Sequence, residues 1–452
     1  MTRTGRRDGY AGEAEPFLDE RTGFRGWRFW VGAGRGIPTP AVVDGRVYFG
    51  GGFGSHEVYA LEGHSGHLRW QLRTRDDGPT AVVGVGRFVA FNTESCTLEV
   101  VDALDGRPMW ERWLGDPLLA QPAMAGHRVV MAYPRAGRHW LGAFDLASGD
   151  PLWETALEHD VITAPVVAEG HVFLSTFDGT VWSIDPSSGA VLWQRSLDAT
   201  SAPWVYRGEV YVARRTREPQ GASGSEERAM ATAPPDVGAS PRARARAVPT
   251  EETTAWDATV GAFKARHQAK EAAYLSATWG VKRKRAFLAA DAAVGFARGP
   301  AAAKLDDVRH LIGETSVART WRFQGSRPVV VEGVLYETTG DRLEASDVVT
   351  GQRRWGWSAA KAVEGERRLT PPAVARGRVL AGTWDGRVLS WDAAAGAIVW
   401  EVEVGAPCHW QPVMAGGWVY AGLEDGSVVA FDTRDPACDG WPMWGGGAGH
   451  NG

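Results

Sequence analysis

A tryptophan recurs along this chain at a nearly constant interval, and this repeat limits the possible folds more than any other feature. Consecutive members of the series lie 40 to 45 residues apart, in two runs separated by a long gap. The series consists of Trp70, Trp110, Trp153 and Trp193, followed by Trp355, Trp400 and Trp441. Such a period indicates a repeat protein, in which each unit buries its faces only against its neighbours.

Each repeat contains the same succession of short strands and turns. A typical unit reads APVVAEGHVFLSTFDGTVWSIDPSSGAVLW and ends at Trp193. The runs 171–176 and 180–184 are rich in β-branched and aromatic residues, which favour strands. Asp178 and Gly179 between these runs supply the backbone conformation of a two-residue hairpin turn. Four such strands in about 40 residues predict one blade of a β-propeller.

An acidic residue precedes the last turn of each unit, in register with the tryptophan. Glu62 holds this place in the first copy. Aspartate holds it in the others, at Asp102, Asp145, Asp185, Asp347, Asp392 and Asp432. An aspartate before a tight turn can accept hydrogen bonds from the amides of that turn, so we assign these residues a structural role. We expect the tryptophans to pack between blades, because one blade cannot cover its own faces.

The pattern Ala-x-Asp-x-x-x-Gly-x-x-x-Trp resembles the repeat of the pyrroloquinoline-quinone-like (PQQ-like) β-propeller family. This family includes quinoprotein alcohol dehydrogenases and the propeller lipoprotein of the outer-membrane assembly machine. The resemblance covers most of the chain apart from an insertion and the extreme termini. The stretches FNTESCTLEVVDALDG, DVITAPVV and FQGSRPVVVEGVLYETTGD are also similar to uncharacterised bacterial members. The resemblance implies an all-β propeller of four-stranded antiparallel blades.

The spacing also predicts the number of blades. The interval from Trp193 to Trp321 has room for one blade and an insertion of roughly 90 residues. Trp321 then closes the fifth blade, and the total is eight. A closed ring leaves no exposed sheet edge, so we expect the segment 26–32 to pair with the final blade. The alternative is the C-terminal WPMWGGG, whose Pro442 needs an edge position.

These considerations divide the chain into four parts. Residues 1–23 are an N-terminal extension, and residues 24–213 hold the closing strand, blades one to four and the start of blade five. Residues 214–313 are the insertion, with a flexible loop at 218–250 and helices at 254–311. The loop lacks apolar periodicity, whereas Ala, Lys, Glu and Arg dominate the helical part. Residues 314–452 complete blade five and add blades six to eight with a C-terminal tail.

The strongest charge feature is a basic run in the insertion, formed by Lys282, Arg283, Lys284 and Arg285. One interpretation is contact with an acidic partner, nucleic acid or an anionic lipid surface, which would make the insertion an anion-binding module. The other is a solvated helix face that docks on an acidic propeller. We favour the second, and expect no nucleic-acid partner, because no nucleic-acid motif or interleaved aromatic residue accompanies the run.

Composition limits the class of protein and its compartment. The chain is 44% apolar and 23% charged with a net charge of −5, which is typical of a folded, water-soluble protein. No apolar run approaches the ~20 residues that span a bilayer. The first thirty residues have no apolar segment typical of a signal peptide, which predicts a cytoplasmic protein if this start is genuine. The resemblance instead implies the periplasm or cell envelope. We expect a monomer.

Three cysteines are too few for a disulfide scaffold. Cys408 and Cys438 fall three strand spacings apart in the last blade, or ~14 Å. This exceeds the ~7 Å limit between the Cα atoms of a disulfide, so we expect both thiols to be unpaired. Cys96 occupies a hairpin turn in blade two, where a packed thiol is favoured over a reactive one.

Catalytic chemistry finds little support in the sequence. The resemblance to quinoprotein dehydrogenases implies a calcium ion on carboxylate and amide oxygens, a catalytic aspartate, and commonly a disulfide between adjacent cysteines. This chain has no adjacent cysteines, and we assign no catalytic or cofactor-binding residue. His64 and His67 flank a turn without partners at ligand spacing, so we expect no metal site.

We therefore consider three functions. The first is a non-catalytic propeller without a cofactor, which binds a protein or another macromolecule on one face or at its channel mouth. By resemblance, its role would be scaffolding or assembly in the bacterial cell envelope. The alternatives are a PQQ- and calcium-dependent dehydrogenase and an anion-binding module built on the basic insertion.

Overall fold

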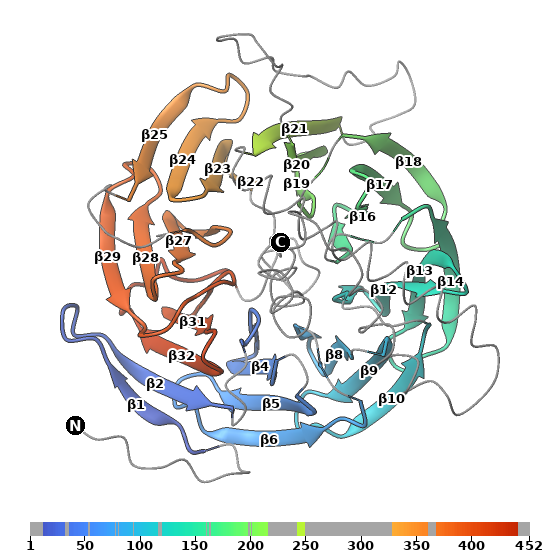
Figure 1. The fold of residues 1–452 in the computed structure, drawn as a ribbon, viewed down its shortest axis with the longest axis horizontal. Coiled ribbons are helices and arrows are strands. Elements are labelled where there is room, and N and C mark those ends of the chain that lie inside the picture. The colour runs from blue at the N-terminus through green and yellow to red at the C-terminus, as the bar shows by residue number, and fades with distance from the viewer. Residues whose placement is uncertain are drawn as a thin grey trace, which may run out of the picture.

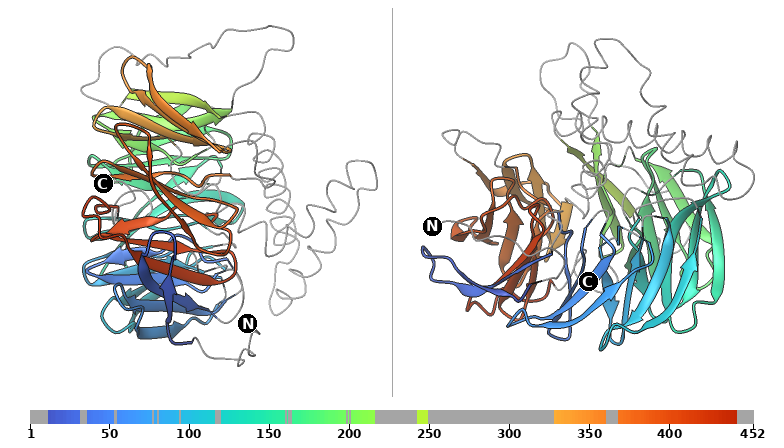
Figure 2. Two further views of the ribbon diagram at one scale, coloured as in Figure 1. Left: turned by 90° about the vertical axis from the view of Figure 1, so that its left-hand side faces the viewer. Right: turned by 60° about the horizontal axis from the view of Figure 1, so that its bottom comes forward.

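A computed structural model describes residues 12–215, 242–248, 328–359 and 368–441. Within the first range it leaves gaps at 32–35, 53–54, 77, 80, 94, 116–119, 160, 162–163, 198 and 200. The described residues form an all-β propeller of four-stranded antiparallel blades, arranged around a central axis (Figure 1). Seen from the side, the blades form a disc (Figure 2).

Seven complete blades, numbered I to VII in chain order, account for most strands. Blade I contains β3 (Ala41–Val43), β4 (Arg46–Gly50), β5 (Glu57–Glu62) and β6 (Leu68–Arg73). Blade II contains β7 (Val83–Val85), β8 (Phe88–Asn92), β9 (Thr97–Asp102) and β10 (Pro108–Trp113). Blade III contains β11 (Ala123–Ala125), β12 (Arg128–Arg135), β13 (Arg138–Asp145) and β14 (Pro151–Leu157). Blade IV contains β15 (Val166–Ala168), β16 (His171–Ser175), β17 (Thr180–Ile184) and β18 (Val191–Ser196).

The second half of the ring repeats this order. Blade V contains β22 (Pro328–Val331), β23 (Val334–Thr339), β24 (Arg342–Asp347) and β25 (Arg353–Ser358). Blade VI contains β26 (Ala373–Ala375), β27 (Arg378–Gly382), β28 (Arg387–Asp392) and β29 (Ile398–Glu403). Blade VII contains β30 (Val413–Ala415), β31 (Trp418–Gly422) and β32 (Ser427–Asp432), together with β2 (Arg25–Trp30) and β1 (Glu15–Leu18).

The prediction of eight blades is not supported. Where the fifth blade was expected, the described residues form a sheet of only three strands, which we call the incomplete sheet. Its first two strands, β19 (Trp204–Tyr206) and β20 (Glu209–Arg215), are antiparallel, whereas β21 (Arg242–Val248) pairs with β20 in parallel. β20 ends at the predicted insertion, and the described residues show no antiparallel hairpin after it.

The insertion also differs from the prediction. β21 lies inside the segment 218–250, which the sequence analysis assigned to a flexible loop. Its sequence RARARAV alternates with a period of two residues, which suits a strand. The helices expected at 254–311, the basic run 282–285 and Trp321 all lie outside the described residues. Within the described ranges the structure contains no helix, and so none that could span a membrane.

The N-terminal segment closes the ring. β2 pairs antiparallel with β32, from Arg25 opposite Asp432 to Trp30 opposite Ser427, and so provides the fourth strand of blade VII. This is the pairing expected for the segment 26–32. The predicted N-terminal extension also contains a strand, because β1 pairs with β2 as a fifth strand. The C-terminal segment reaches the opposite edge of the same blade, where Trp441 forms an isolated bridge with Met414.

Hydrophobic residues between neighbouring blades form the core. Between blades I and II, for example, Tyr48 and Val58 pack with Phe91 and Val101, all with at most 1% of their surface exposed. Each of the six outermost strands that follow a hairpin carries a β-bulge directly before its tryptophan. A bulge adds a residue and bends the strand, which in these blades occurs where the indole turns toward the next blade.

Candidate functional site

The repeated tryptophans link each blade to the next one. In four cases the indole Nε1 donates a hydrogen bond to a backbone carbonyl of the next blade, that of the residue directly after the turn aspartate. These bonds join Trp70 to Ala103 at 3.1 Å, Trp110 to Leu146 at 3.0 Å, Trp153 to Pro186 at 2.9 Å and Trp355 to Ala393 at 2.9 Å. They fix the angle between blades and therefore the geometry of both faces of the disc.

A glycine in each turn makes room for the indole. Gly106 has a φ of 72°, and a Cβ atom added there would lie 2.7 Å from the Trp70 ring. Gly189 is related to Trp153 in the same way, with a distance of 2.6 Å. The glycine therefore provides both a left-handed backbone conformation and space for the ring, which no residue with a side chain could provide without strain.

The repeated aspartates hold these turns. Asp185 accepts hydrogen bonds from the amides of Ser187 and Ser188, both at 2.8 Å. The Ser187 hydroxyl, followed by the Ser188 amide, lowers the pKa of Asp185 to about 2. The Thr350 amide and then the Arg354 guanidinium lower the pKa of Asp347 to about 2. Because the carboxylates accept bonds within their own turns, we assign them no role in ligand binding.

Trp27, which the sequence analysis did not single out, holds the tryptophan position of blade VII. Its Nε1 donates to the carbonyl of Gly63 in blade I at 2.7 Å, and Gly63 directly follows Glu62. Trp27 pairs with Ala430, which lies two residues before Asp432. Trp70 likewise pairs with Ala60, which lies two residues before Glu62. The assignment of Trp441 to this place was wrong. The sequence signal for Trp27 is the segment GWRFWVG, which resembles the last strand of a blade.

Two tryptophans of the series lack the bond to the next sheet. The Nε1 atoms of Trp193 and Trp400 are buried and have no hydrogen-bond partner in the described structure. Trp193 precedes the incomplete sheet, and Trp400 precedes blade VII. Within the described residues, neither sheet has a fourth strand that follows its third through a hairpin, which sets both apart from the sheets that accept the other indole bonds.

The three cysteines are buried and none forms a disulfide. Cys96 lies in the turn between β8 and β9 with a φ of 63°, and none of its surface is exposed. The Cys408 thiol donates to the Trp410 carbonyl at 3.3 Å, and burial raises its pKa to about 12. Burial likewise raises the pKa of Cys438 to about 11. A reactive thiol needs exposure and a lowered pKa, so these cysteines are unsuitable as nucleophiles.

A pocket of about 700 Å³ opens where the innermost strands of three consecutive sheets turn into their second strands. These strands are β19 of the incomplete sheet, β22 of blade V and β26 of blade VI. Residues 439–441, which follow blade VII, complete the wall. We call this the β19–β22–β26 pocket. Its volume lies within the range of ligand-binding sites.

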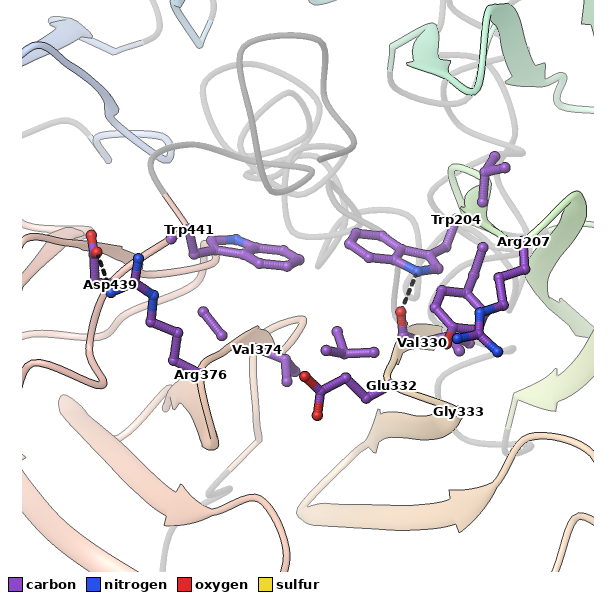
Figure 3. A pocket seen from close by; sticks show the side chains of 14 residues that line it. Trp204, Arg207, Val330, Glu332, Gly333, Val374, Arg376, Asp439 and Trp441 are labelled. Carbon is purple, nitrogen blue, oxygen red and sulfur yellow. Dashed lines mark hydrogen bonds and ion pairs between the residues drawn. The ribbon is translucent and has the colours of Figure 1, made fainter.

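The walls of this pocket are apolar and aromatic. Trp204 and Trp441 stack with ring centroids 5.3 Å apart and planes inclined by 11°. The Trp204 Nε1 donates to the carbonyl of Val330 at 3.0 Å, which fixes this indole to blade V. Figure 3 shows the two indoles next to each other, and the Glu332 side chain extending from its turn toward Val374. Trp441 thus belongs to the pocket rather than to the repeated contacts between blades.

Charged residues at the hairpin turns form the rim. Arg207, Glu332 and Arg376 hold equivalent turn positions in the three sheets, with φ values of 49°, 51° and 45°. Blades II, III and VII instead have glycine at this position, as Gly86, Gly126 and Gly416. A side chain at positive φ costs about 1 kcal/mol relative to glycine. Asp44 of blade I and Glu169 of blade IV also hold this position, so a charged residue occurs there in five of the eight sheets, three of which meet at the rim.

The charges on the rim are not all neutralised within the protein. Arg376 forms an ion pair with Asp439 at 3.0 Å. The Arg207 guanidinium lies over the Tyr206 ring, 5.2 Å from its centroid. Within the described residues, neither Arg207 nor Glu332 forms an ion pair, and both are exposed. The rim therefore presents one cationic and one anionic group to a ligand.

The donor set of the pocket does not fit calcium. Calcium takes six to eight oxygen ligands, mostly from carboxylates and carbonyls. The pocket has two carboxylates, Glu332 and Asp439, and the second is already paired with Arg376. Across the described ranges, no group of three or more His, Cys, Asp or Glu side chains is placed to hold a metal ion. We therefore derive no reaction step through a quinone and calcium.

Comparison with known proteins agrees with the repeat. A PQQ-like repeat model described as "Outer membrane protein assembly factor BamB" matches residues 17–139, 94–218 and 313–437, which is well over half of the chain. The chain belongs to this family. The resemblance inferred from the repeat is thereby confirmed, and the unmatched stretch corresponds to the insertion.

Curated members of the BamB-like family share moderate identity with parts of the chain. The outer membrane protein assembly factor BamB of Yersinia pestis is 24% identical over 171 residues, covering 34% of this chain and 43% of that protein. A quinone-dependent alcohol dehydrogenase subunit of Gluconobacter oxydans is 34% identical over 90 residues, covering 18% of this chain and 12% of that subunit. The chain spans half or less of the length of these relatives.

Two solved structures share the fold. BamB from Moraxella catarrhalis superposes with a TM-score of 0.54 at 14% identity, covering 90% of this chain and 98% of that one. A quinohemoprotein alcohol dehydrogenase from Pseudomonas putida gives a TM-score of 0.53 at 14% identity, covering 90% and 75%. Because the scores are nearly equal, the fold does not distinguish a scaffold from a dehydrogenase.

Proposed function

We propose that this protein is a non-catalytic propeller that binds a protein partner at the β19–β22–β26 pocket and serves as an assembly scaffold in the bacterial cell envelope. The observation that supports this most is the pocket itself. It combines apolar and aromatic walls with an exposed charged rim, which is the composition typical of the centre and edge of a protein interface. The family adds support, since several of its curated members are named outer membrane protein assembly factors.

The way the pocket is built suits binding rather than catalysis. Its wall residues Trp204 and Val330 are joined by a hydrogen bond between two sheets, so the surface is preformed and little ordering is needed on binding. Tryptophan and arginine are enriched among the residues that dominate binding energy at interfaces. Among the described residues that line the pocket there is no cysteine, serine or histidine.

A quinone-dependent dehydrogenase is the second candidate. It is favoured by the 34% identity to the Gluconobacter oxydans subunit, over a stretch of 90 residues. The carboxylates in the pocket argue against it, because they are too few to hold the calcium ion. Calorimetric titration with PQQ and calcium tests this candidate directly. Saturable heat of binding, followed by reduction of a dye with an alcohol, would replace the scaffold proposal.

The scaffold proposal is tested by site-specific photocross-linking in the native bacterium. A photoreactive amino acid replaces Glu332 on the pocket face, and in a matched strain it replaces Asp178, which lies in a hairpin on the opposite face of the disc. We expect a cross-link at residue 332, absent at residue 178, to a component of outer-membrane assembly. Deletion of the gene should lower the amount of folded outer-membrane proteins. Normal levels after deletion, with no such cross-link, would refute the proposal.

A further inference from the structure

Three features of the β19–β22–β26 pocket specify the chemistry of its occupant. The first is space, because about 700 Å³ exceeds one side chain and can hold a short segment of extended chain. The second is apolarity, since the nearly buried Trp204, Val330, Val374 and Trp441 form the floor, and the half-buried Tyr206 and Val331 face the opening. An occupant therefore gains most by inserting apolar or aromatic groups, because burial of apolar surface is the dominant favourable contribution to association.

The third feature is the charge of the rim. Arg376 is neutralised by Asp439, which leaves Arg207 on one turn and Glu332 on the next. A purely anionic ligand would be attracted by Arg207 and repelled by Glu332. A purely cationic ligand would be attracted by Glu332 and repelled by Arg207. Charge complementarity therefore favours an occupant with both signs, one on each side of its apolar part.

Arg207 and Glu332 lie at φ values of 49° and 51°, a conformation that Asp44 and Glu169 share in blades that do not line the pocket, so the backbone alone does not single them out. Neither side chain forms an ion pair in the described structure that would explain its presence. The two charges are therefore available to a ligand of complementary charge.

We propose that the pocket binds an extended segment of a protein partner in which an acidic and a basic residue flank one or two apolar residues. The apolar residues occupy the pocket, the acidic side chain faces Arg207, and the basic side chain faces Glu332. This inference rests on the proposed function, because it specifies the partner that the scaffold binds.

The test measures fluorescence anisotropy of three labelled peptides with the purified full chain. Their central sequences are Asp-Phe-Leu-Lys, Asp-Phe-Leu-Asp and Lys-Phe-Leu-Lys, between neutral ends. We expect the mixed-charge peptide to bind about three- to fivefold more tightly than either like-charged peptide, since each exposed ion pair contributes modestly. High salt should reduce this difference.

Charge reversal provides the decisive variants. Arg207→Glu should make the Lys-flanked peptide the best ligand, and Glu332→Lys should do the same for the Asp-flanked peptide. A change in preference cannot arise from loss of folding, which would weaken all three peptides together. Asp44→Lys is the matched control. Asp44 has the same turn position in blade I, with a φ of 48°, but does not line the pocket, so the original order should persist.

A further variant tests the apolar part. Val331 lines the pocket and is only partly buried, so Val331→Asp should weaken all three peptides without unfolding the protein. Unchanged order of the peptides in both charge-reversal variants, or no binding at millimolar peptide, would overturn the inference. Self-association of the protein that Arg207→Glu abolishes would also overturn the inference, because the pocket would then bind a second copy of this chain. The cross-link at residue 332 would still test the scaffold function independently.

Discussion

The indole of Trp27 donates a hydrogen bond to the carbonyl of Gly63, 2.7 Å away, across the junction between the last and first blades. This bond joins the N-terminal closing strand to the complete repeat that follows it. The same contact recurs between other neighbouring blades, so the junction that seals the ring has the geometry of an ordinary one. Closure therefore depends on residues that precede the first complete repeat.

Replacement of Trp27 should weaken the closed ring. Trp27→Phe keeps most of the apolar contact but leaves the Gly63 carbonyl without its donor, and we expect a loss of about 1–3 kcal/mol in the free energy of unfolding. Urea unfolding followed by circular dichroism measures this loss. Trp193→Phe is the matched control, because the Trp193 Nε1 has no hydrogen-bond partner in the described structure. We expect this substitution to lower the free energy of unfolding clearly less than Trp27→Phe. Equal losses in both variants would argue against the hydrogen bond.

Gly26 should tolerate no side chain. A Cβ atom at this position would lie 1.8 Å from the carbonyl oxygen of Ala430 on β32, so Gly26→Ala must displace the closing strand. We expect a loss of more than about 2 kcal/mol and faster hydrogen exchange in β32, measured by mass spectrometry. Gly12→Ala, which would meet nothing within 4 Å, serves as the control. Exchange in β32 at the wild-type rate would show that β2 stays in place.

Stability should fall as pH rises toward neutrality because of Glu99. Burial, followed by the charges of Glu111 and Asp76, raises the pKa of Glu99 to about 7. The unfolded carboxyl ionises near pH 4.5 and the folded one near pH 7, so the penalty for ionisation is absent below about pH 4.5. It grows between these values and is complete above about pH 7.

Removal of this carboxyl tests the assignment. We expect Glu99→Gln to stabilise the protein by roughly 1–3 kcal/mol at pH 8, and to change little at pH 4. The free energy of unfolding, measured in urea from pH 4 to pH 8, gives the comparison. Glu403→Gln, at an exposed position on the outer strand β29, is the control substitution. A constant difference between Glu99→Gln and wild type across this range would contradict the raised pKa.

The cysteines should resist modification while the protein is folded. All three are buried, and burial raises the pKa of Cys408 to about 12 and that of Cys438 to about 11. At pH 8 we expect no reaction with Ellman's reagent in buffer and three reacting thiols in guanidinium chloride. Rapid reaction of one thiol in the folded protein would contradict this prediction. If Cys96→Ser abolished that reaction, Cys96 would be the accessible thiol.

Much of the fold can be predicted from the repeat, because the contacts that form its turns join residues close together in the chain. Asp185 accepts bonds from amides two and three residues later, and Gly189 lies in the same turn. Such contacts depend on residues close in the chain, so their pattern predicts the turn directly. The period between tryptophans then indicates blades, because a strand pattern of this length must pack against a neighbouring copy.

The candidate site was not predicted, because its residues come from distant parts of the chain. Trp204 and Trp441 stack at 5.3 Å although they are more than 200 residues apart, and no motif links them. Arg207 and Glu332 each look like ordinary turn residues in the sequence. Only their placement on neighbouring sheets, beside a shared pocket, reveals an exposed pair of opposite charges.

The sequence by itself determined the class of fold, the strands of each blade and the turns between them, because hydrophobic alternation and turn chemistry act over a few residues. Tertiary structure decided the rest. Pairing of β2 with β32 made Trp27 the closing tryptophan, and pairing of β20 with β21 in parallel left one sheet incomplete. These outcomes depend on contacts between distant segments, whose energies cannot be read from local patterns.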